Sequence, residues 1–266
     1  MNPEEYANIY KSEDHHWWYR GMWGISAALL ERHLPRAWGG WRVLDAGCGT
    51  GGVLSRLASY GRTAGVDASP LALGFARCRG HRGLAQATVE ALPFRDESFD
   101  LVVSFDVLQH QSIADEARAL SELARVLRPR GWLLLRLPAY GWLGSAHDAF
   151  VHTRHRYVAG EVRQFVKGAG LWLRRLTYAN TLLFGPIAVR RLAGRLFDDA
   201  RSDVAALPAP LNALLRAPLA AEAAWLRERD LPFGLTVIAL AQKKPSVISH
   251  TCSGKVAMFL WDANAA

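Results

Sequence analysis

A short apolar run that ends in a cluster of glycines constrains the fold of this chain most. Residues 41–46 (WRVLDA) read as a buried strand, and Gly47, Gly49 and Gly52 follow at once. Glycines between a strand and a helix let the backbone turn tightly and approach a ligand without a Cβ clash. Apolar residues at helical spacing over 53–58 then predict a helix. We therefore predict a strand, a ligand-binding loop and a helix in direct succession.

The same alternation of apolar strands and amphipathic helices continues along the chain. We predict further strands at 63–67, 84–87, 100–105, 132–137, 171–178 and 235–242, and helices at 25–34, 70–79, 120–127 and 160–168. Strands that alternate with helices connect by right-handed crossovers. The predicted fold class is α/β, a doubly wound and mostly parallel sheet with an antiparallel last strand.

Five parts are expected in the chain. Residues 1–35 form an aromatic N-terminal lid and a helix, and 36–180 form the core that binds the cofactor. Residues 181–232 are too long for a plain connection and are interpreted as a helical insert or cap. Residues 233–244 are the last core strand, and 245–266 an irregular tail.

The composition bears on partners and location. The formal charge is +8 over 266 residues, but the arginines of 154–229 stand singly or in pairs among Leu and Ala. That spacing is typical of solvated helix faces and disfavours nucleic acid as a partner. Cys48, Cys78 and Cys252 are too scattered for a disulfide framework or a zinc site. With no apolar run that spans a bilayer and no signal-peptide pattern, we expect a cytoplasmic protein without a transmembrane segment.

The glycine loop by itself leaves two kinds of cofactor open. Gly47, Gly49 and Gly52 match G-x-G-x-x-G. Asp67 comes about 20 residues later, which is the sequence spacing of the acid that binds ribose hydroxyls in dinucleotide-binding folds. Both features also suit a nicotinamide dinucleotide. Asp45, directly before the glycines, is poorly suited to a pyrophosphate and compatible with a cationic aminoacyl and sulfonium group.

Several segments between residues 43 and 137 resemble, in order, the motifs of class I S-adenosylmethionine-dependent methyltransferases of the type 11 branch. They are 43–51 (VLDAGCGTG), 65–69 (GVDAS), 90–94 (EALPF), 98–104 (SFDLVVS) with 106–110 (DVLQH), and 125–131 (RVLRPRG). The resemblance implies a Rossmann-like fold that binds S-adenosyl-L-methionine and releases S-adenosyl-L-homocysteine.

The resemblance also assigns site residues. Asp45, Gly47 and Gly49 would line the methionine portion, and Asp67 would accept the ribose hydroxyls. The full set of expected cofactor-binding residues is Asp45, Gly47, Cys48, Gly49, Gly51, Asp67, Ala68, Val89, Glu90, Phe105, His110, Trp18 and Arg20. Instead of binding a cofactor, the glycines could form a simple turn and Asp67 could be a helix N-cap.

This chain departs from the family pattern in three places. Thr88 stands where many relatives have Asp, so the contact to the adenine amino group is in question. Gln109 stands where many have Glu, which removes a candidate metal ligand. Arg130 replaces a usual Gly in a turn.

The N-terminal residues 13–20 (EDHHWWYR) resemble an H-W-W-F segment that forms a lid in one branch of these enzymes. Trp17 and Trp18 point to different sides of a regular element, so one can face the pocket, where a sulfonium gains cation–π attraction. Arg20 could pair with the cofactor carboxylate. The alternative is that both tryptophans only anchor the segment to the core.

A loop rich in histidine follows the fifth predicted strand, at the edge where such sheets bind their substrates. His147 beside Asp148 is the candidate general base. Tyr140, His152 and Tyr157 are the candidate residues for contact with the acceptor. A metal site or a purely structural hydrogen-bonded network is the alternative, and we predict no metal.

The sequence thus predicts a methyltransferase that acts on an oxygen or nitrogen of a small molecule, a metabolite or a glycan-like acceptor. One alternative is an RNA methyltransferase, which the charge favours. Another is a protein that binds the cofactor without catalysis, or uses it without methylation. The mixed Leu, Ala and Arg helices of 181–230 suit a homodimer interface.

Overall fold

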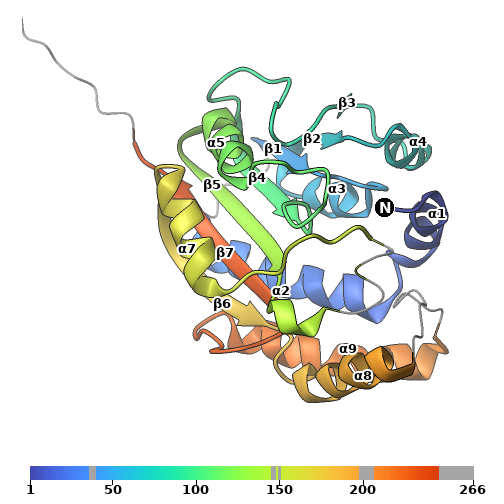
Figure 1. Cartoon of the computed structure of the whole chain (residues 1–266). Helices are drawn as coiled ribbons and strands as arrows, with labels where there is room; N and C mark the ends of the chain where they lie inside the picture. Colours follow the sequence, from blue (N-terminus) through green and yellow to red (C-terminus); the bar gives the residue numbers. More distant parts are fainter. Residues whose placement is uncertain (36–39, 145–147, 149–150, 198–206, 246–266) are drawn as a thin grey trace, which may run out of the picture.

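The computed structural model describes residues 1–35, 40–144, 148, 151–197 and 207–245. Its strands are β1 (Trp41–Ala46), β2 (Gly61–Asp67), β3 (Leu84–Gln86), β4 (Phe99–Phe105), β5 (Leu127–Pro138), β6 (Leu171–Ala179) and β7 (Thr236–Lys243). Within these residues they form one seven-stranded sheet of order β3-β2-β1-β4-β5-β7-β6 (Figure 1). β7 is antiparallel to β5 and β6, and the other neighbours are parallel. The predicted Rossmann-like sheet with an antiparallel last strand is confirmed.

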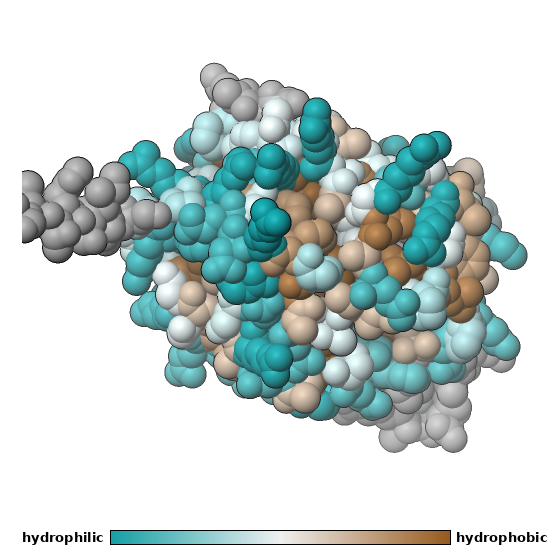
Figure 2. All heavy atoms as spheres, turned by 90° about the horizontal axis from the view of Figure 1, so that it is seen from above, coloured by the Kyte–Doolittle hydropathy of each residue, from teal (hydrophilic) through white to brown (hydrophobic). Residues whose placement is uncertain are grey.

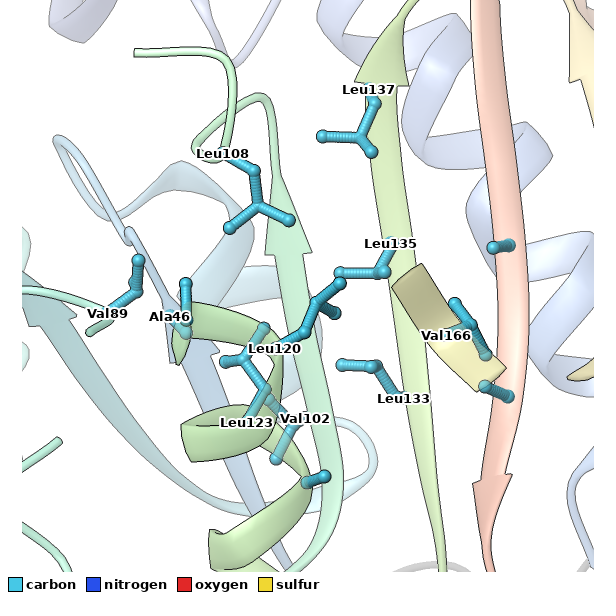
Figure 3. Close-up of a cluster of buried hydrophobic side chains, with 14 of the residues drawn as sticks. Ala46, Val89, Val102, Leu108, Leu120, Leu123, Leu133, Leu135, Leu137 and Val166 are labelled. Carbon is cyan, nitrogen blue, oxygen red and sulfur yellow. The ribbon is translucent and has the colours of Figure 1, made fainter. Parts of the chain in front are cut away.

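Helices cover both faces of this sheet. They are α1 (Pro3–Ser12), α2 (Trp17–His33), α3 (Gly52–Leu57), α4 (Pro70–Cys78), α5 (Glu116–Val126), α7 (Ala159–Gly168), α8 (Phe184–Phe197) and α9 (Ala209–Trp225), and a 3-10 turn, η1, spans Gly141–Leu143. Leu120 of α5 and Val166 of α7 pack against one face together with Leu133 (Figure 3). Leu29 of α2 and Leu219 of α9 belong to the core on the opposite face. The central strands are apolar throughout because both of their faces are buried.

The loops at the carboxyl ends of the parallel strands are held by helix caps. The Ser69 hydroxyl accepts a hydrogen bond from Ala72 N at 3.3 Å, and Pro70 occupies the first turn of α4. The Asp115 carboxylate accepts a hydrogen bond from Arg118 N at 3.0 Å at the start of α5. Such caps satisfy backbone donors that the helix leaves without partners, so they set where each loop ends.

One predicted turn lies inside a strand. Residues 129–131 belong to β5, which begins at Leu127, and the pairing with β4 shifts register between Phe99 and Leu101. Arg130 there has a φ of +65°. Only glycine reaches this conformation without a steric cost, which is a physical reason for the glycine that the family pattern has at this position.

The segment 181–232, interpreted as an insert or cap, contains two helices with different positions. α9 packs against α2 and so covers the sheet, whereas α8 contributes to the wall of a cavity. The tail predicted as irregular lies outside the described residues from 246 onward. In the part of the chain that the structure describes, no helix combines the length and the apolar character that crossing a membrane requires.

Candidate functional site

A cavity of about 730 Å³ lies at the carboxyl ends of the parallel strands. Its wall includes the glycine loop, the ends of β2, β4 and β5, the start of β7, α8 and the N-terminal segment 1–19. Elsewhere the surface is mixed: in Figure 2 hydrophilic side chains cover much of the face, with apolar areas between them. In open α/β sheets this edge is where ligands bind.

The glycine loop closes tightly over the end of β1. Gly47 has a φ of +94°, and a Cβ there would come 2.1 Å from Val107 Cγ2. Its backbone N–H donates to Val66 O at 2.7 Å, and the Gly49 N–H donates to Asp67 Oδ2 at 2.9 Å. Gly47 and Gly49 both line the cavity. A side chain at Gly47 would therefore meet both a strained backbone and the neighbouring loop.

Asp67 presents its carboxylate to this cavity from the end of β2. The carboxylate accepts hydrogen bonds from Gly49 N at 2.9 Å and Ser69 N at 2.8 Å. Burial raises the pKa of Asp67, and these backbone hydrogen bonds oppose that rise. An ionised carboxylate can accept about four hydrogen bonds, so it retains capacity for the hydroxyls of a bound ligand.

Asp45 lies behind the cavity wall at the end of β1. Its side chain is buried, and its Oδ2 has no hydrogen-bond partner. Burial, followed by the charge of Asp67, raises the pKa of Asp45 to about 8. A buried acceptor without a partner is costly, so this position favours a nearby cation or hydrogen-bond donor.

The other predicted cofactor-binding residues divide into two groups. Ala68, Val89, Phe105, His110 and Trp18 line the cavity. Cys48, Gly51, Glu90 and Arg20 do not line it.

Two of these four have side chains that the structure places elsewhere. The Glu90 carboxylate accepts hydrogen bonds from Ala114 N and Asp115 N, at 3.1 Å and 2.8 Å, before α5. Arg20 is exposed on α2. The expected contacts of Glu90 beside an adenine and of Arg20 with a cofactor carboxylate therefore find no support in this geometry.

The N-terminal segment is fastened to the glycine loop by Glu13. The Glu13 carboxylate accepts a hydrogen bond from the Thr50 hydroxyl and pairs with Arg79 Nη2 at 3.0 Å. Arg79 also donates to Thr50 O at 3.1 Å and lies over the ring of Tyr10 at 4.6 Å. Sequence analysis did not select Glu13, although its place in the 13–20 motif was a usable signal.

Aromatic side chains of the same segment face the cavity. Tyr6, Trp17, Trp18 and Tyr19 all line it, and the rings of Trp17 and Trp18 meet edge to face at 5.7 Å. The side chain of His16 accepts a hydrogen bond from Trp18 N at 3.3 Å and so caps α2. The segment forms part of the cavity wall, and the lid function that the H-W-W-F resemblance implies stays a prediction.

The predicted catalytic pair is described only in part, because His147 lies outside the described residues. Asp148 lines the cavity, and its carboxylate accepts two hydrogen bonds from Arg156, at 2.5 Å and 2.8 Å. A bidentate pair of this kind holds the carboxylate firmly. In this geometry Asp148 orients Arg156.

The three predicted acceptor-binding residues do not line the cavity. Tyr157 is fully buried in the core, and Tyr140 stacks on Tyr178 with ring centroids 5.4 Å apart. The ring of His152 lies 5.6 Å from that of His110. Burial, the Met1 amino group and His152 lower the pKa of His110 to about 4, so His110 is neutral at pH 7.

Four arginines line the cavity although sequence analysis selected none of them: Arg136, Arg156, Arg190 and Arg191. Arg136 donates to Asp106 Oδ2 from two nitrogens, at 2.9 Å and 2.7 Å. An arginine inside the apolar run of β5 was a usable signal, because a buried charge needs a partner. Across the described residues, no group of three or more His, Cys, Asp or Glu side chains is arranged to hold a metal ion.

Comparison with known proteins supports the resemblance. The family model described as a methyltransferase domain matches residues 44–135. A Mycobacterium tuberculosis protein named "Probable S-adenosylmethionine-dependent methyltransferase" is 35% identical over 141 residues, 52% of this chain and 49% of that protein. The human "Probable tRNA methyltransferase 9B" is 39% identical over 114 residues, 42% of this chain and 24% of that protein. The chain spans about half the length, or less, of the curated relatives it matches.

Solved structures show the same fold. A Thermotoga maritima S-adenosylmethionine-dependent methyltransferase, described as a possible histamine N-methyltransferase, aligns with a TM-score of 0.58 and 18% identity. The alignment covers 91% of this chain and 95% of that one. At this identity the likeness concerns the arrangement of the sheet and its helices.

Proposed function

We propose that this chain, whose residues 44–135 match a methyltransferase domain, is a class I S-adenosylmethionine-dependent methyltransferase that transfers the cofactor's methyl group to a small-molecule acceptor bound in the same cavity. The acceptor atom is an oxygen or nitrogen of a metabolite or glycan-like compound. Bound S-adenosylmethionine would supply an electrophilic methyl group on its sulfonium.

The observation that carries the proposal is the pair of carboxylates flanking the glycine loop. Asp67 faces the cavity with acceptor capacity for two ribose hydroxyls. Asp45, buried behind Gly47 with an unpartnered oxygen, fits an ammonium or sulfonium nearby. The residues present therefore fit this cofactor, because a cation beside Asp45 would favour its ionised form and an anionic pyrophosphate would not.

The lid supports a small acceptor in particular. Aromatic rings of 1–19 form one side of the cavity, so they provide apolar surface beside an occupant. Enclosure orients the reactants and excludes water, and alignment supplies much of the acceleration in methyl transfer. A general base at His147 with Asp148 stays a proposal, whereas contact of the acceptor with Tyr140, His152 or Tyr157 has no support in this cavity, because none of the three lines it.

Cofactor binding is tested by calorimetry with S-adenosylhomocysteine. We expect one molecule bound per chain, and Asp67→Ala should weaken binding by about a hundredfold, because charge-assisted hydrogen bonds contribute about 1.5–3 kcal/mol each. Asp96→Ala removes an exposed carboxylate outside the cavity wall and is the matched control. Unchanged affinity in Asp67→Ala, with the fold retained by circular dichroism, would refute the ribose contact.

An RNA acceptor is the second candidate. The formal charge of +8 and the likeness to the human tRNA methyltransferase support it. RNA binding through phosphates weakens steeply as salt rises. Methylation of a transfer RNA mixture with such salt dependence, and none of a small-molecule panel, would favour this candidate.

Three further properties stay proposals: where the protein is located, whether it forms a dimer, and whether it binds or uses the cofactor without methylation. We keep a cytoplasmic location and a homodimer through residues 181–230. Leu214 and Trp225 of α9 are exposed and suit such an interface. Light scattering that gives a monomer mass at micromolar concentration would contradict the dimer.

A further inference from the structure

An ion pair between the loop after β4 and the strand β5 lies in the cavity wall, and we propose that this pair, Asp106 with Arg136, binds a neutral hydroxyl group of the acceptor. Asp106 accepts a hydrogen bond from the hydroxyl, and Arg136 donates one to the hydroxyl oxygen. This inference rests on the proposed function and narrows the acceptor atom from oxygen or nitrogen to oxygen.

The sheet places this pair away from the ribose end of the cavity. Asp106 directly follows β4, and Arg136 of β5 pairs in register with Phe105, the last residue of β4. β1 lies between β4 and β2, the strand that ends at Asp67. With neighbouring strands about 4.8 Å apart, β2 and β4 are about 10 Å from each other. The ion pair and Asp67 therefore belong to distinct subsites of one cavity.

Several contacts fix the direction of both side chains. Arg136 Nε and Nη2 donate to Asp106 Oδ2 at 2.9 Å and 2.7 Å, and the guanidinium lies over the ring of Phe105, 4.5 Å from its centroid. Asp106 N donates to Arg136 O at 2.8 Å. Asp106 has a φ of +56°, a conformation that Asp adopts more readily than most residues. The carboxylate is thus held from its backbone and from one of its two oxygens.

This arrangement leaves polar atoms at the wall without partners. Among the described residues, neither Asp106 Oδ1 nor Arg136 Nη1 makes a hydrogen bond or an ion pair. Gln109, three residues further along the same loop, also lines the cavity, and its buried Oε1 has no partner either. A buried acceptor without a donor is costly. The loop therefore favours an occupant that brings a hydrogen-bond donor.

A hydroxyl group matches this set of atoms. Its hydrogen donates to a carboxylate and its oxygen accepts from a guanidinium, so one group satisfies both residues of the pair. An aliphatic amine is an ammonium at pH 7 and has no acceptor for Arg136, and a carboxylate has no hydrogen for Asp106. The charges of Asp106 and Arg136 offset each other, which suits a neutral group.

The rest of the acceptor would contact apolar surface. Tyr6, Trp17 and Trp18 line the same cavity from the N-terminal segment. Aromatic rings bind flat, apolar bodies well. The expected acceptor is therefore an alcohol or a phenol with an apolar or aromatic body.

The test uses the protein saturated with S-adenosylhomocysteine and three probes of similar shape: benzyl alcohol, benzyl methyl ether and benzylamine. Ligand-observed NMR titration at pH 7 measures each dissociation constant. We expect benzyl alcohol to bind at least about tenfold more tightly than the ether, which has no hydrogen to donate, and more tightly than the cationic amine. Equal binding of alcohol and ether, amine binding as tight as that of the alcohol, or no binding of the alcohol overturns the inference.

Variants then locate the hydroxyl. Asp106→Asn keeps the shape of the side chain, and its amide oxygen can still accept from Arg136, so an NH₂ group takes the place of Oδ1. This variant should prefer the alcohol over the ether by about twofold or less and keep its affinity for S-adenosylhomocysteine. Asp100→Asn is the matched control, because Asp100 pairs with Arg128 near the opposite ends of β4 and β5, outside the cavity wall.

Arg136→Lys is the second variant, in case Asp106→Asn does not fold by circular dichroism. It keeps the positive charge but loses the planar fork that directs the carboxylate, so the preference for the alcohol should also fall to about twofold or less. An unchanged preference in a folded variant would overturn the inference. So would a parallel loss of S-adenosylhomocysteine affinity, because the pair would then hold the cofactor. If wild-type protein binds no S-adenosylhomocysteine at all, the proposed function fails instead.

Discussion

Asp45 and Asp67 end neighbouring strands but lie in different surroundings. The Asp67 carboxylate accepts two backbone hydrogen bonds at the cavity wall. Asp45 is 2% exposed, and one of its oxygens has no partner. Burial and the charge of Asp67 raise the pKa of Asp45 to about 8, so at pH 7 it is largely protonated. The pKa of Asp67 is also raised by burial, but its two backbone hydrogen bonds oppose that rise, and Asp45 has no such bonds at its Oδ2.

Binding of the cationic cofactor should therefore release a proton. A positive charge near Asp45 favours its carboxylate and lowers its pKa, so S-adenosylmethionine should displace close to one proton at pH 7. Calorimetry in phosphate and in Tris, which differ in ionisation enthalpy, measures this proton. Asp45→Asn should abolish the release. Equal apparent enthalpies in both buffers for wild-type protein would contradict the assignment.

Asp45 should also make stability depend on pH. Its pKa is 3.8 in the unfolded chain and about 8 in the folded one, so the folded state binds the extra proton between these values. The free energy of unfolding should therefore fall as pH rises through this window. Asp45→Asn should flatten that part of the profile, which urea unfolding at about pH 5 and about pH 8 would measure.

At the scale of elements, close contact with α2 holds α9, the helix that precedes the last strand β7. Gly21 of α2 lies against Leu219 of α9, and a Cβ on Gly21 would come 2.3 Å from Leu219 Cδ1 and 2.8 Å from its Cβ. Gly24, on the same helix, has no atom within 4 Å of an added Cβ. The two glycines therefore allow a matched comparison.

Gly21→Ala should lower the free energy of unfolding by about 1–2 kcal/mol, because overpacking outweighs the gain in helix propensity. Gly24→Ala should raise it by up to about 1 kcal/mol. In a Leu219→Ala background the contact with Cδ1 is removed and only the 2.8 Å approach to the Leu219 Cβ remains, so Gly21→Ala should destabilise less than it does in the wild-type background. Urea unfolding of the four variants measures the coupling, and additive effects would contradict the packing.

At the scale of the whole molecule, one cavity is lined by segments from near both ends of the chain. The N-terminal segment 1–19 and α8 both line it, although the methyltransferase motifs lie between them in sequence. Glu13 connects the N-terminal segment to the glycine loop through Thr50 and Arg79. The N-terminal segment and the glycine loop should therefore behave as one unit.

Glu13→Ala should disconnect them. The variant should bind S-adenosylhomocysteine about tenfold more weakly, because it leaves Arg79 without its buried partner and the lid must be ordered on binding. Limited proteolysis should cleave it within residues 1–20 faster than wild-type protein. Glu4→Ala, exposed on the same segment, is the control. Wild-type affinity together with a wild-type cleavage pattern would refute the coupling.

Local patterns in the sequence predicted most of the sheet and the cofactor end of the cavity. Gly47 and Gly49 come just after β1, and Asp67 is the last residue of β2. Because the carboxyl ends of parallel strands meet at one edge of the sheet, these residues could be predicted to lie together. The side chain of Glu90 was harder to place. It lies close to the predicted position, but it binds backbone N–H groups before α5 instead of facing the cavity. Motif spacing gives the path of the backbone, whereas the direction of a side chain depends on its neighbours.

The sequence by itself thus determined the sheet, the glycine loop and the acid that faces it, because backbone sterics and strand–helix alternation act over a few residues. Only the tertiary structure decided the rest of the cavity wall and its surroundings. It buried Tyr157, paired Asp148 with Arg156 and brought Arg190 and Arg191 to the cavity. These arginines are far in sequence from the glycine loop, and their place depends on how α8 leaves the sheet after β6. Such long-range packing has no local signal in the order of residues.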